Sequence, residues 1–276
     1  MIRYLEDNEK RRSEVLYREA FFEDKDEFVE YYYSYVTKNN KILVLEQEGD
    51  ICSMLHLNPY QLSVNGHKVE AYYYVAVATR EVFRHQGMMR KLLNHSLHDI
   101  HREGHPFAYL MPADKAIYEP FDFRIVYQQK QIEVPEVPEL ANEMLSQRFD
   151  VFTMRDDWYA ERIKEEARIC AGDPPSEIVP YIMMRITNVA KMLELLRCEK
   201  SMSVVLEVED SIIEENNGKF LWEISESESR CKKIQNSAEG IQVTIADLTE
   251  FVFGKRNIRG LEDIRVLSRI CINEAV

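Results

Sequence analysis

A single stretch in the first half of the chain passes from a strand, through a basic turn, into a helix. Residues 68–79 are apolar enough for a long strand, and Asn65-Gly66 just before them is a strong signal for a hairpin. Residues 87–102 carry apolar side chains at helical spacing. Gly87 stands at the junction of this turn and the helix, with the basic residues Arg84 and Arg90 on either side of it. Such a turn aims backbone N–H groups and the positive end of a helix at one point, which suits a pyrophosphate. These residues alone also fit an ordinary strand-to-helix turn.

The order of predicted elements indicates an α/β (α+β) chain in three segments. The first predicted segment holds two helices within residues 5–35, then strands at 41–46, 51–57, 61–64 and 68–79, the helix at 87–102, a strand at 106–111, a short helix at 113–118 and a strand at 123–132. The rest holds helices at 140–149 and 156–170, a strand at 181–186, a helix ending near 196, strands at 203–208, 219–224 and 241–245, and a helix at 247–253. Proline-rich breaks divide the chain into a mixed-sheet domain (1–133), a helical segment (134–178) and a smaller α+β domain (179–276).

Charge and composition narrow the class of protein. The formal net charge is −13, which disfavours nucleic acid and makes a cationic substrate such as an amine easier to accommodate. No run approaches the length of a membrane span, and the charged start lacks the apolar core of a signal peptide, so we expect a cytoplasmic protein that does not bind membranes. Five scattered cysteines form neither a disulfide framework nor a zinc site. The oligomeric state stays open, with a homo-oligomer among the options.

Several side chains that suggest a site have simpler interpretations. His95, His98 and His101 lie opposite the apolar face of the predicted helix, so we expect them to face solvent and predict no metal site. The tyrosine triplets at 31–33 and 72–74 fit core packing better than a pocket. Asp24 and Asp26 are placed to cap the second predicted helix.

Two segments resemble a known family. The run Val75-Ala76-Val77-Ala78-Thr79, followed by Arg84-His85-Gln86-Gly87, resembles motif A of the GNAT N-acetyltransferases. Ile117-Tyr118-Glu119-Pro120-Phe121-Asp122-Phe123 resembles a segment of one branch, the enhanced intracellular survival (Eis) acetyltransferases. Members of that branch end in a sterol-carrier-protein-like domain. Segments 184–189, 206–210, 245–254 and 271–276 of this chain resemble it.

The resemblance implies a fold, an activity and a set of site residues. It implies a mixed sheet flanked by helices, followed by a sterol-carrier-like domain, and direct acetyl transfer from acetyl-CoA to a primary amine of a small molecule or peptide. In the cofactor site, the pantetheine arm would meet the strand backbone of Val77, Ala78 and Thr79. The pyrophosphate would be wrapped by His85, Gln86, Gly87, Met88, Met89 and Arg90. Beside the arm would lie Ala113 and Asp114. Tyr118 would be the general acid, and the terminal carboxylate of Val276 the general base.

Two departures from the family leave questions open. Branch members usually carry a second acetyltransferase-like domain in the middle, whereas only residues 134–178 are available here. Asp122 stands where the family segment has glycine. For the base, Glu46, Glu70 and Asp114 are rivals of Val276. For the function, a non-catalytic acyl-CoA sensor or lipid-binding protein on the same fold is the alternative.

Overall fold

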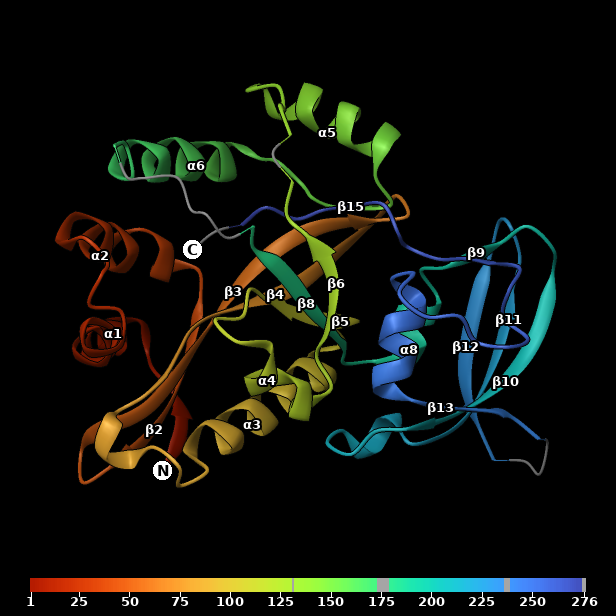
Figure 1. The fold of residues 1–276 in the computed structure, drawn as a ribbon, viewed down its shortest axis with the longest axis horizontal. Helices are drawn as coiled ribbons and strands as arrows, with labels where there is room; N and C mark the ends of the chain where they lie inside the picture. The colour runs from red at the N-terminus through yellow and green to blue at the C-terminus, as the bar shows by residue number, and fades with distance from the viewer. Residues whose placement is uncertain (131, 173–178, 236–238, 275–276) are drawn as a thin grey trace.

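A large mixed sheet with helices on both faces forms most of the molecule, and a smaller domain lies beside it (Figure 1). The computed structural model describes residues 1–130, 132–172, 179–235 and 239–274. The main path of the large sheet runs β1 (Ile2–Tyr4), β2 (Lys41–Gln47), β3 (Asp50–Val64), β4 (His67–Thr79), β5 (Phe107–Leu110), β8 (Tyr181–Ile186) and β6 (Arg124–Gln128). Two short strands, β7 (Val151–Thr153) and β15 (Ile270–Cys271), extend it beyond β3. The expected α/β class with a mixed, helix-flanked sheet is confirmed.

Side-chain alternation divides the large sheet into two packed faces. The first face is covered by α1 (Glu14–Ala20) and α2 (Asp26–Ser34), and the second by α3 (Met88–Glu103) and α4 (Lys115–Tyr118). Tyr73 packs on the first face, whereas Tyr72 and Tyr74 pack on the second, as the two-residue period of a strand requires. The 3₁₀ turn Asp7–Ser13 precedes α1, so the start of the first predicted helix is not α-helical.

The segment at 134–178 contributes two helices and a strand rather than a domain with its own sheet. Its helices are α5 (Pro138–Arg148) and α6 (Asp157–Ile169). Between them β7 pairs antiparallel with β3, and β15 from the end of the chain then pairs parallel with β7. The expected helices are therefore present. The strand between them pairs with β3 from the first half of the chain and with β15 from the second half, so both halves contribute to one sheet.

Strand β8 lies in the large sheet although the sequence groups it with the last segment. It pairs antiparallel with β5 on one side and with β6 on the other. The apolar run at 181–186 predicts a strand but says nothing of its partners. All of its residues but the first are buried, because helix α8 (Ile245–Val252) packs against it.

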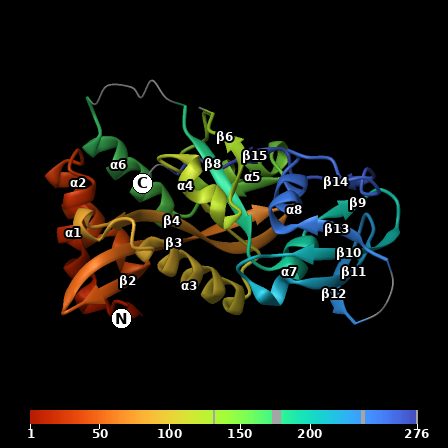
Figure 2. The ribbon, with the colours of Figure 1, turned by 60° about the horizontal axis from the view of Figure 1, so that its bottom comes forward.

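The smaller domain has a four-stranded sheet of its own. Its strand order is β12 (Ser229–Ile234), β11 (Gly218–Ile224), β10 (Met202–Glu209) and β13 (Ile241–Thr244), with β10 and β13 parallel. Helix α7 (Val189–Leu193) and the pair β9 (Arg197–Cys198) and β14 (Ile264–Arg265) complete it. Trp222 is fully buried in its core. Figure 2 shows this domain at the opposite end of the molecule from α1 and α2.

Strands β4 and β5 pair only over part of their length, and this opening positions the site. Their parallel pairing covers Tyr72 to Tyr74, and the described residues show no partner for β4 beyond Tyr74 on that side. At the same place the register between β3 and β4 shifts, and Ala76 has φ +50°. The bulge turns the end of β4 away from β5, which leaves a cleft between the two strands.

Candidate active site

Two adjoining cavities occupy the opening between β4 and β5. The first, which we call the basic cavity, has a volume of about 570 Å³ and is lined by Ala20, Phe21, Val77, Ala78, Thr79, Phe83, Arg84, His85, Gly87, Met88, Met89, Arg90, Ile117 and Phe121. The second, the acidic cavity, measures about 540 Å³ and is lined by Tyr17, Phe21, Glu23, Asp24, Lys25, Phe28, Tyr73, Tyr74, Val75, Ala76, Val77, Met111, Pro112, Ala113, Tyr118, Ile169 and Cys170. Phe21 and Val77 line both, so the two cavities form one continuous site. None of the lining residues of the basic cavity is acidic.

The N-terminus of α3 supplies the floor of the basic cavity. Gly87 is the N-cap residue with φ +74°, and the first intrahelical bond runs from Lys91 N to Gly87 O at 3.1 Å. The N–H groups of the three residues before Lys91 therefore have no intrahelical acceptor and are available to an anion. A Cβ on Gly87 would meet nothing within 4 Å, so the space beside it is open. Arg84 and Arg90 add positive charge at this point.

The structure brings most of the predicted cofactor-binding residues together. Those that line the basic cavity are Val77, Ala78, Thr79, His85, Gly87, Met88, Met89 and Arg90. Gln86 lines neither cavity, because its side chain donates back to Val82 O at 3.1 Å. Ala113 lines the acidic cavity. Asp114 is instead the N-cap of α4, where its carboxylate accepts from Ala116 N at 2.9 Å.

Tyr118 lies at the end of α4 and lines the acidic cavity. Its side chain is 9% exposed and packs edge-on against Phe123, with ring centroids 6.1 Å apart. Burial raises the pKa of Tyr118 to about 12, because the apolar surroundings disfavour the phenolate. The hydroxyl therefore stays protonated at neutral pH. It can donate a proton and cannot act there as a base.

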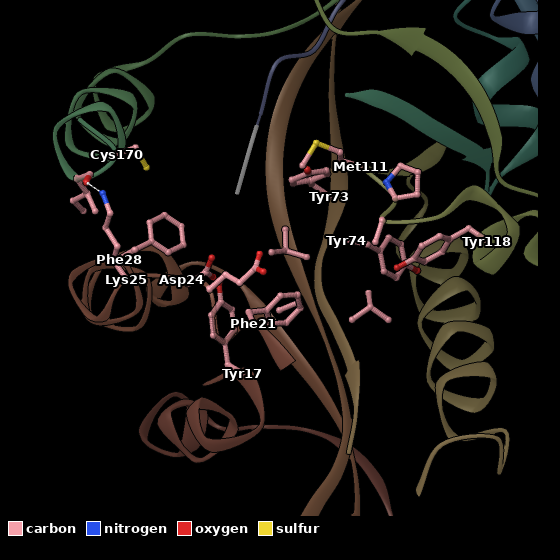
Figure 3. Close-up of a pocket in the computed structure, with 17 residues that line it drawn as sticks. Tyr17, Phe21, Asp24, Lys25, Phe28, Tyr73, Tyr74, Met111, Tyr118 and Cys170 are labelled. Atoms are coloured by element: carbon pink, nitrogen blue, oxygen red, sulfur yellow. Dashed lines mark hydrogen bonds between the residues drawn. The ribbon is translucent and has the colours of Figure 1, made fainter. Parts of the chain in front are cut away.

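The far wall of the acidic cavity comes from α1, α2 and the turn between them. Figure 3 shows Tyr17, Phe21 and Asp24 across the pocket from Tyr74 and Tyr118. The Tyr17 hydroxyl donates to Asp24 Oδ2 at 2.7 Å, and burial together with this carboxylate raises the pKa of Tyr17. Sequence reasoning missed this wall.

Asp24 was expected to cap α2, but the N-cap is Lys25, and the Asp24 side chain is held by Tyr17 instead. Tyr73 and Tyr74 both line the acidic cavity, so core packing describes only part of their role. Only the density of tyrosines in α2 and β4 hinted at a pocket.

Comparison with known families identifies both parts of this architecture. Residues 1–126 match the family model of an acetyltransferase (GNAT) domain, and residues 189–274 match that of a sterol carrier protein domain. The chain joins a GNAT acetyltransferase domain to a sterol carrier protein domain. The resemblance seen in the strand-turn-helix segment and in the second half of the sequence is thereby confirmed. A GNAT domain supports acetyl transfer from an acyl-CoA.

Solved structures share this fold over nearly the whole chain. A conserved protein of unknown function from Enterococcus faecalis, a probable N-acyltransferase, has a TM-score of 0.75 at 15% identity and covers 96% of this chain and 93% of its own. Eis1 from Mycobacterium abscessus has a TM-score of 0.69 at 14% identity, covering 97% and 94%. A GCN5-related N-acetyltransferase from Anabaena variabilis has a TM-score of 0.69 at 14% identity, covering 96% and 94%. No curated protein matches the chain in sequence.

Val276, the expected base of the GNAT site, lies outside the described residues. The residues just before it are held in place by hydrogen bonds. Tyr127 donates to Asn273 Oδ1 at 3.1 Å, and Gln129 Nε2 donates to the Glu274 carbonyl at 3.0 Å. The Glu274 side chain is fully buried. Tyr73 lines the acidic cavity, and its pKa is raised first by its own burial and second by the charge of Glu274. The last described residue therefore lies near the GNAT acceptor region.

The three rival bases line neither cavity of the GNAT domain. Glu46 pairs with Arg3 and Arg12, and Glu70 accepts from Gln61. Asp114 is occupied as a helix cap. The carboxylates that do line the acidic cavity are Glu23 and Asp24, which sequence reasoning did not single out.

The helix α3 histidines have local partners. His95 Nε2 lies 3.4 Å from Asp99 Oδ2, and His101 Nδ1 lies 2.8 Å from the Thr187 carbonyl. Across the described ranges, no group of three or more His, Cys, Asp or Glu side chains could hold a metal ion. Across the same ranges, the helices are all too short or too polar to cross a membrane.

Proposed function

We propose that this protein transfers the acetyl group of acetyl-CoA directly to a primary amine of a cationic acceptor. The observation that carries the proposal is the single opening between β4 and β5, where a basic cavity and an acidic cavity meet beside a buried, protonated tyrosine. The matched GNAT domain supplies the class of reaction.

The basic cavity suits the phosphate end of acetyl-CoA. The free N–H groups at the start of α3 and the charges of Arg84 and Arg90 would hold the pyrophosphate. The edge of β4 at Val77 to Thr79, beyond its pairing with β5, would hydrogen-bond the pantetheine arm as an added strand would. This arrangement directs the thioester from the basic cavity toward Tyr118.

The acidic cavity suits an ammonium group. Glu23 and Asp24 supply negative charge, while Tyr17, Phe21 and Phe28 supply aromatic faces that attract cations. Lys25 also lines the cavity, and its Nζ donates to the Ile169 carbonyl at 3.0 Å. We propose that this wall binds a positive charge on the acceptor while the reacting amine points to Tyr118.

The reaction requires two proton movements. The amine nitrogen forms a bond to the carbonyl carbon of the thioester as the C–S bond breaks. Tyr118 gives its proton to the leaving thiolate, and a base accepts the proton from the attacking nitrogen. The products are the acetylated amine and free CoA.

The identity of the base remains a prediction, and two carboxylates are candidates. Val276 would act through its terminal carboxylate, as the family resemblance implies. Glu23, a carboxylate of the acidic cavity, is the competing source. A short C-terminal extension moves the first carboxylate and leaves the second in place. We expect the extension to lower kcat while acetyl-CoA still binds, and an unchanged kcat would assign the base to Glu23.

An acceptor panel tests the proposal. Free CoA release is measured with acetyl-CoA and butylamine, 1,4-diaminobutane or 4-aminobutyrate. We expect the diamine to give the highest kcat/KM and 4-aminobutyrate, which carries a carboxylate in place of the second ammonium, the lowest. Butyltrimethylammonium is the matched control, since it has the charge but no transferable proton. Tight acetyl-CoA binding without amine-dependent CoA release would favour a non-catalytic acyl-CoA-binding protein.

A further inference from the structure

A loop of the sterol carrier protein domain reaches the turn that carries Tyr118. This loop, residues 210–217, which we call the clamp loop, lies between β10 and β11 and includes the 3₁₀ turn Glu214–Asn216. The turn that it meets follows α4 directly. It comprises the 3₁₀ turn Glu119–Phe121 and then Asp122, which has φ +63°.

A buried ion pair forms the centre of this contact. Arg185 of β8 and Asp210 of the clamp loop are both fully buried, and Arg185 Nη2 donates to Asp210 Oδ1 at 2.6 Å. Arg185 Nε donates to the Phe121 carbonyl at 3.0 Å. The same guanidinium therefore holds the acidic group of one domain and the backbone of the Tyr118 turn in the other. The planar guanidinium donates from Nη2 to Asp210 and from Nε to Phe121, so its rigid geometry fixes the two partners in direction as well as distance.

The clamp loop is itself held in one conformation around Asp210. Asp210 Oδ1 accepts from the backbone N–H groups of Ile212 and Ile213, each at 2.9 Å. Asp210 Oδ2 accepts from Asn216 Nδ2 at 2.9 Å. These three hydrogen bonds hold the Asp210 carboxylate in one position, so it is a fixed anchor for Arg185.

Two further contacts join the clamp loop to the turn. Ile213 is fully buried in the hydrophobic cluster that contains Tyr118, Phe121 and Phe123. Ser211 Oγ donates to Asp122 Oδ2 at 3.4 Å. The Tyr118 turn is thus contacted by the second domain through an ion pair, an apolar side chain and a hydroxyl.

We propose that Arg185, Asp210 and Ile213 are positioning residues for Tyr118, so that the sterol carrier protein domain sets the geometry of the acid in the GNAT site. This inference rests on the proposed function, in which the Tyr118 hydroxyl protonates the leaving thiolate. Proton transfer needs the donor within hydrogen-bond reach of the sulfur, and displacement by about 1 Å can cost a factor of roughly 10² in rate. The short turn has few local bonds of its own, among them Asp122 N to Glu119 O at 3.0 Å.

A double-mutant cycle tests this role. Arg185→Lys keeps the positive charge but loses the planar donor to Phe121. We expect kcat to fall by roughly 10–100-fold while the Kd for acetyl-CoA changes less than about twofold. In a Tyr118→Phe background the same substitution should change kcat by less than about twofold, because no hydroxyl remains to be positioned.

A milder variant tests the same role if Arg185→Lys fails to fold. Ile213→Val removes one methyl group from the cluster that contains Tyr118. Ile224→Val removes one from the other hydrophobic cluster, where Ile224 of β11 is 3% exposed. We expect similar losses in Tm from both, with kcat reduced several-fold only by Ile213→Val.

The outcomes separate this inference from the proposed function. If Tyr118→Phe alone keeps wild-type kcat, the acid role fails and the positioning role fails with it. If Tyr118→Phe is slow but Arg185→Lys lowers kcat by the same factor in both backgrounds, the acid role stands and the positioning role is overturned. Equal effects of Ile213→Val and Ile224→Val on kcat would also overturn it.

Discussion

At the scale of single residues, two tyrosines of the acidic cavity have different surroundings. Tyr118 is buried and its pKa is raised to about 12, so it remains a proton donor throughout the pH range in which an amine is nucleophilic. Tyr74 lines the same cavity, but its hydroxyl lies 2.8 Å from Ser96 Oγ. Of these two tyrosines we propose Tyr118 as the acid, because the Tyr74 hydroxyl is engaged by Ser96.

Replacement of Tyr118 by phenylalanine should lower kcat by roughly 10²–10⁴-fold, because the leaving thiolate loses its proton donor. The Kd for acetyl-CoA should barely change, since only one oxygen is removed. Steady-state kinetics and calorimetry measure the two quantities. Tyr74→Phe is the matched control and should keep kcat within a few-fold of wild type. Equal kcat values for the two variants would assign Tyr118 to packing.

His56 makes folding sensitive to acid. Its side chain is fully buried beneath α1 and α2, with Nδ1 2.9 Å from the Tyr32 hydroxyl. Burial, with a smaller contribution from the nearby Lys10 charge, lowers its pKa from the ordinary value of 6.5 to about 3. Between these values the unfolded chain binds a proton that the folded chain does not. The free energy of unfolding should therefore fall as pH drops below about 6.5, by at most about 1.4 kcal/mol per pH unit from this group.

Urea unfolding between pH 7.5 and 4.5 measures this effect. His56→Gln removes the titrating group, so its stability should fall less steeply with acid than that of the wild type. His98→Gln, which makes the same substitution at a half-buried histidine on α3, is the matched control and should follow the wild-type slope. A His56→Gln slope equal to that of wild type would contradict the assignment.

At the scale of elements, helix α3 is bounded by two glycines in the same backbone conformation. Gly87 at its N-terminus has φ +74° and Gly104 at its C-terminus has φ +83°, and a Cβ at either would meet nothing within 4 Å. Only the N-terminal glycine lines the basic cavity. A residue other than glycine would therefore be strained at either position, and the two positions differ in their distance from the proposed anion site.

Gly87→Glu should abolish measurable acetyl-CoA binding, because it places a negative side chain where the pyrophosphate would meet the α3 N–H groups. Gly104→Glu introduces the same charge and comparable strain at the other end of the helix, and it should bind acetyl-CoA with nearly wild-type affinity. Gly87→Ala separates strain from charge and should bind with intermediate affinity. Calorimetry on the three variants decides between them. Similar affinities for Gly87→Glu and Gly104→Glu would place the cofactor elsewhere.

Local elements were predictable where one short signal determined them. Asn65-Gly66 gave the β3–β4 hairpin, and the apolar period gave α3 to within a residue at each end. The partners of β8 were not predictable, because an apolar run specifies a strand and not its neighbours. Strands β7 and β15 are too short to show any period.

Much of the lining of the basic cavity was predictable for the same reason, since most of it lies in the one contiguous segment 77–90. The acceptor half was not, because Asp24 comes from the far end of the first domain and sequence alone fits it equally well as a helix cap. Its role depends on the contact with Tyr17, which only the folded chain shows.

At the scale of the whole molecule, the two matched domains are interleaved rather than linked end to end. Strand β8 leads into the sterol carrier protein domain but fills the space between β5 and β6 of the large sheet. At the other end of that domain, β15 returns to pair with β7. Loss of the smaller domain would also leave Arg185 buried without Asp210, and an unpaired buried charge typically costs about 3–5 kcal/mol.

Interleaving predicts that both parts unfold together. The chain has two tryptophans, and each reports on a different part: Trp158 lies on α6 and stacks with Tyr35, while Trp222 is fully buried in the small sheet. Trp158→Phe leaves a signal from the sterol carrier protein domain, and Trp222→Phe leaves one from α6. In each variant we expect the fluorescence midpoint in urea to coincide with the midpoint from circular dichroism, as in a two-state transition. Comparison within each variant removes the effect of the substitution on stability. Separate midpoints, with the Trp222 signal lost before the helical signal, would show that the smaller domain unfolds alone and does not stabilise the large sheet.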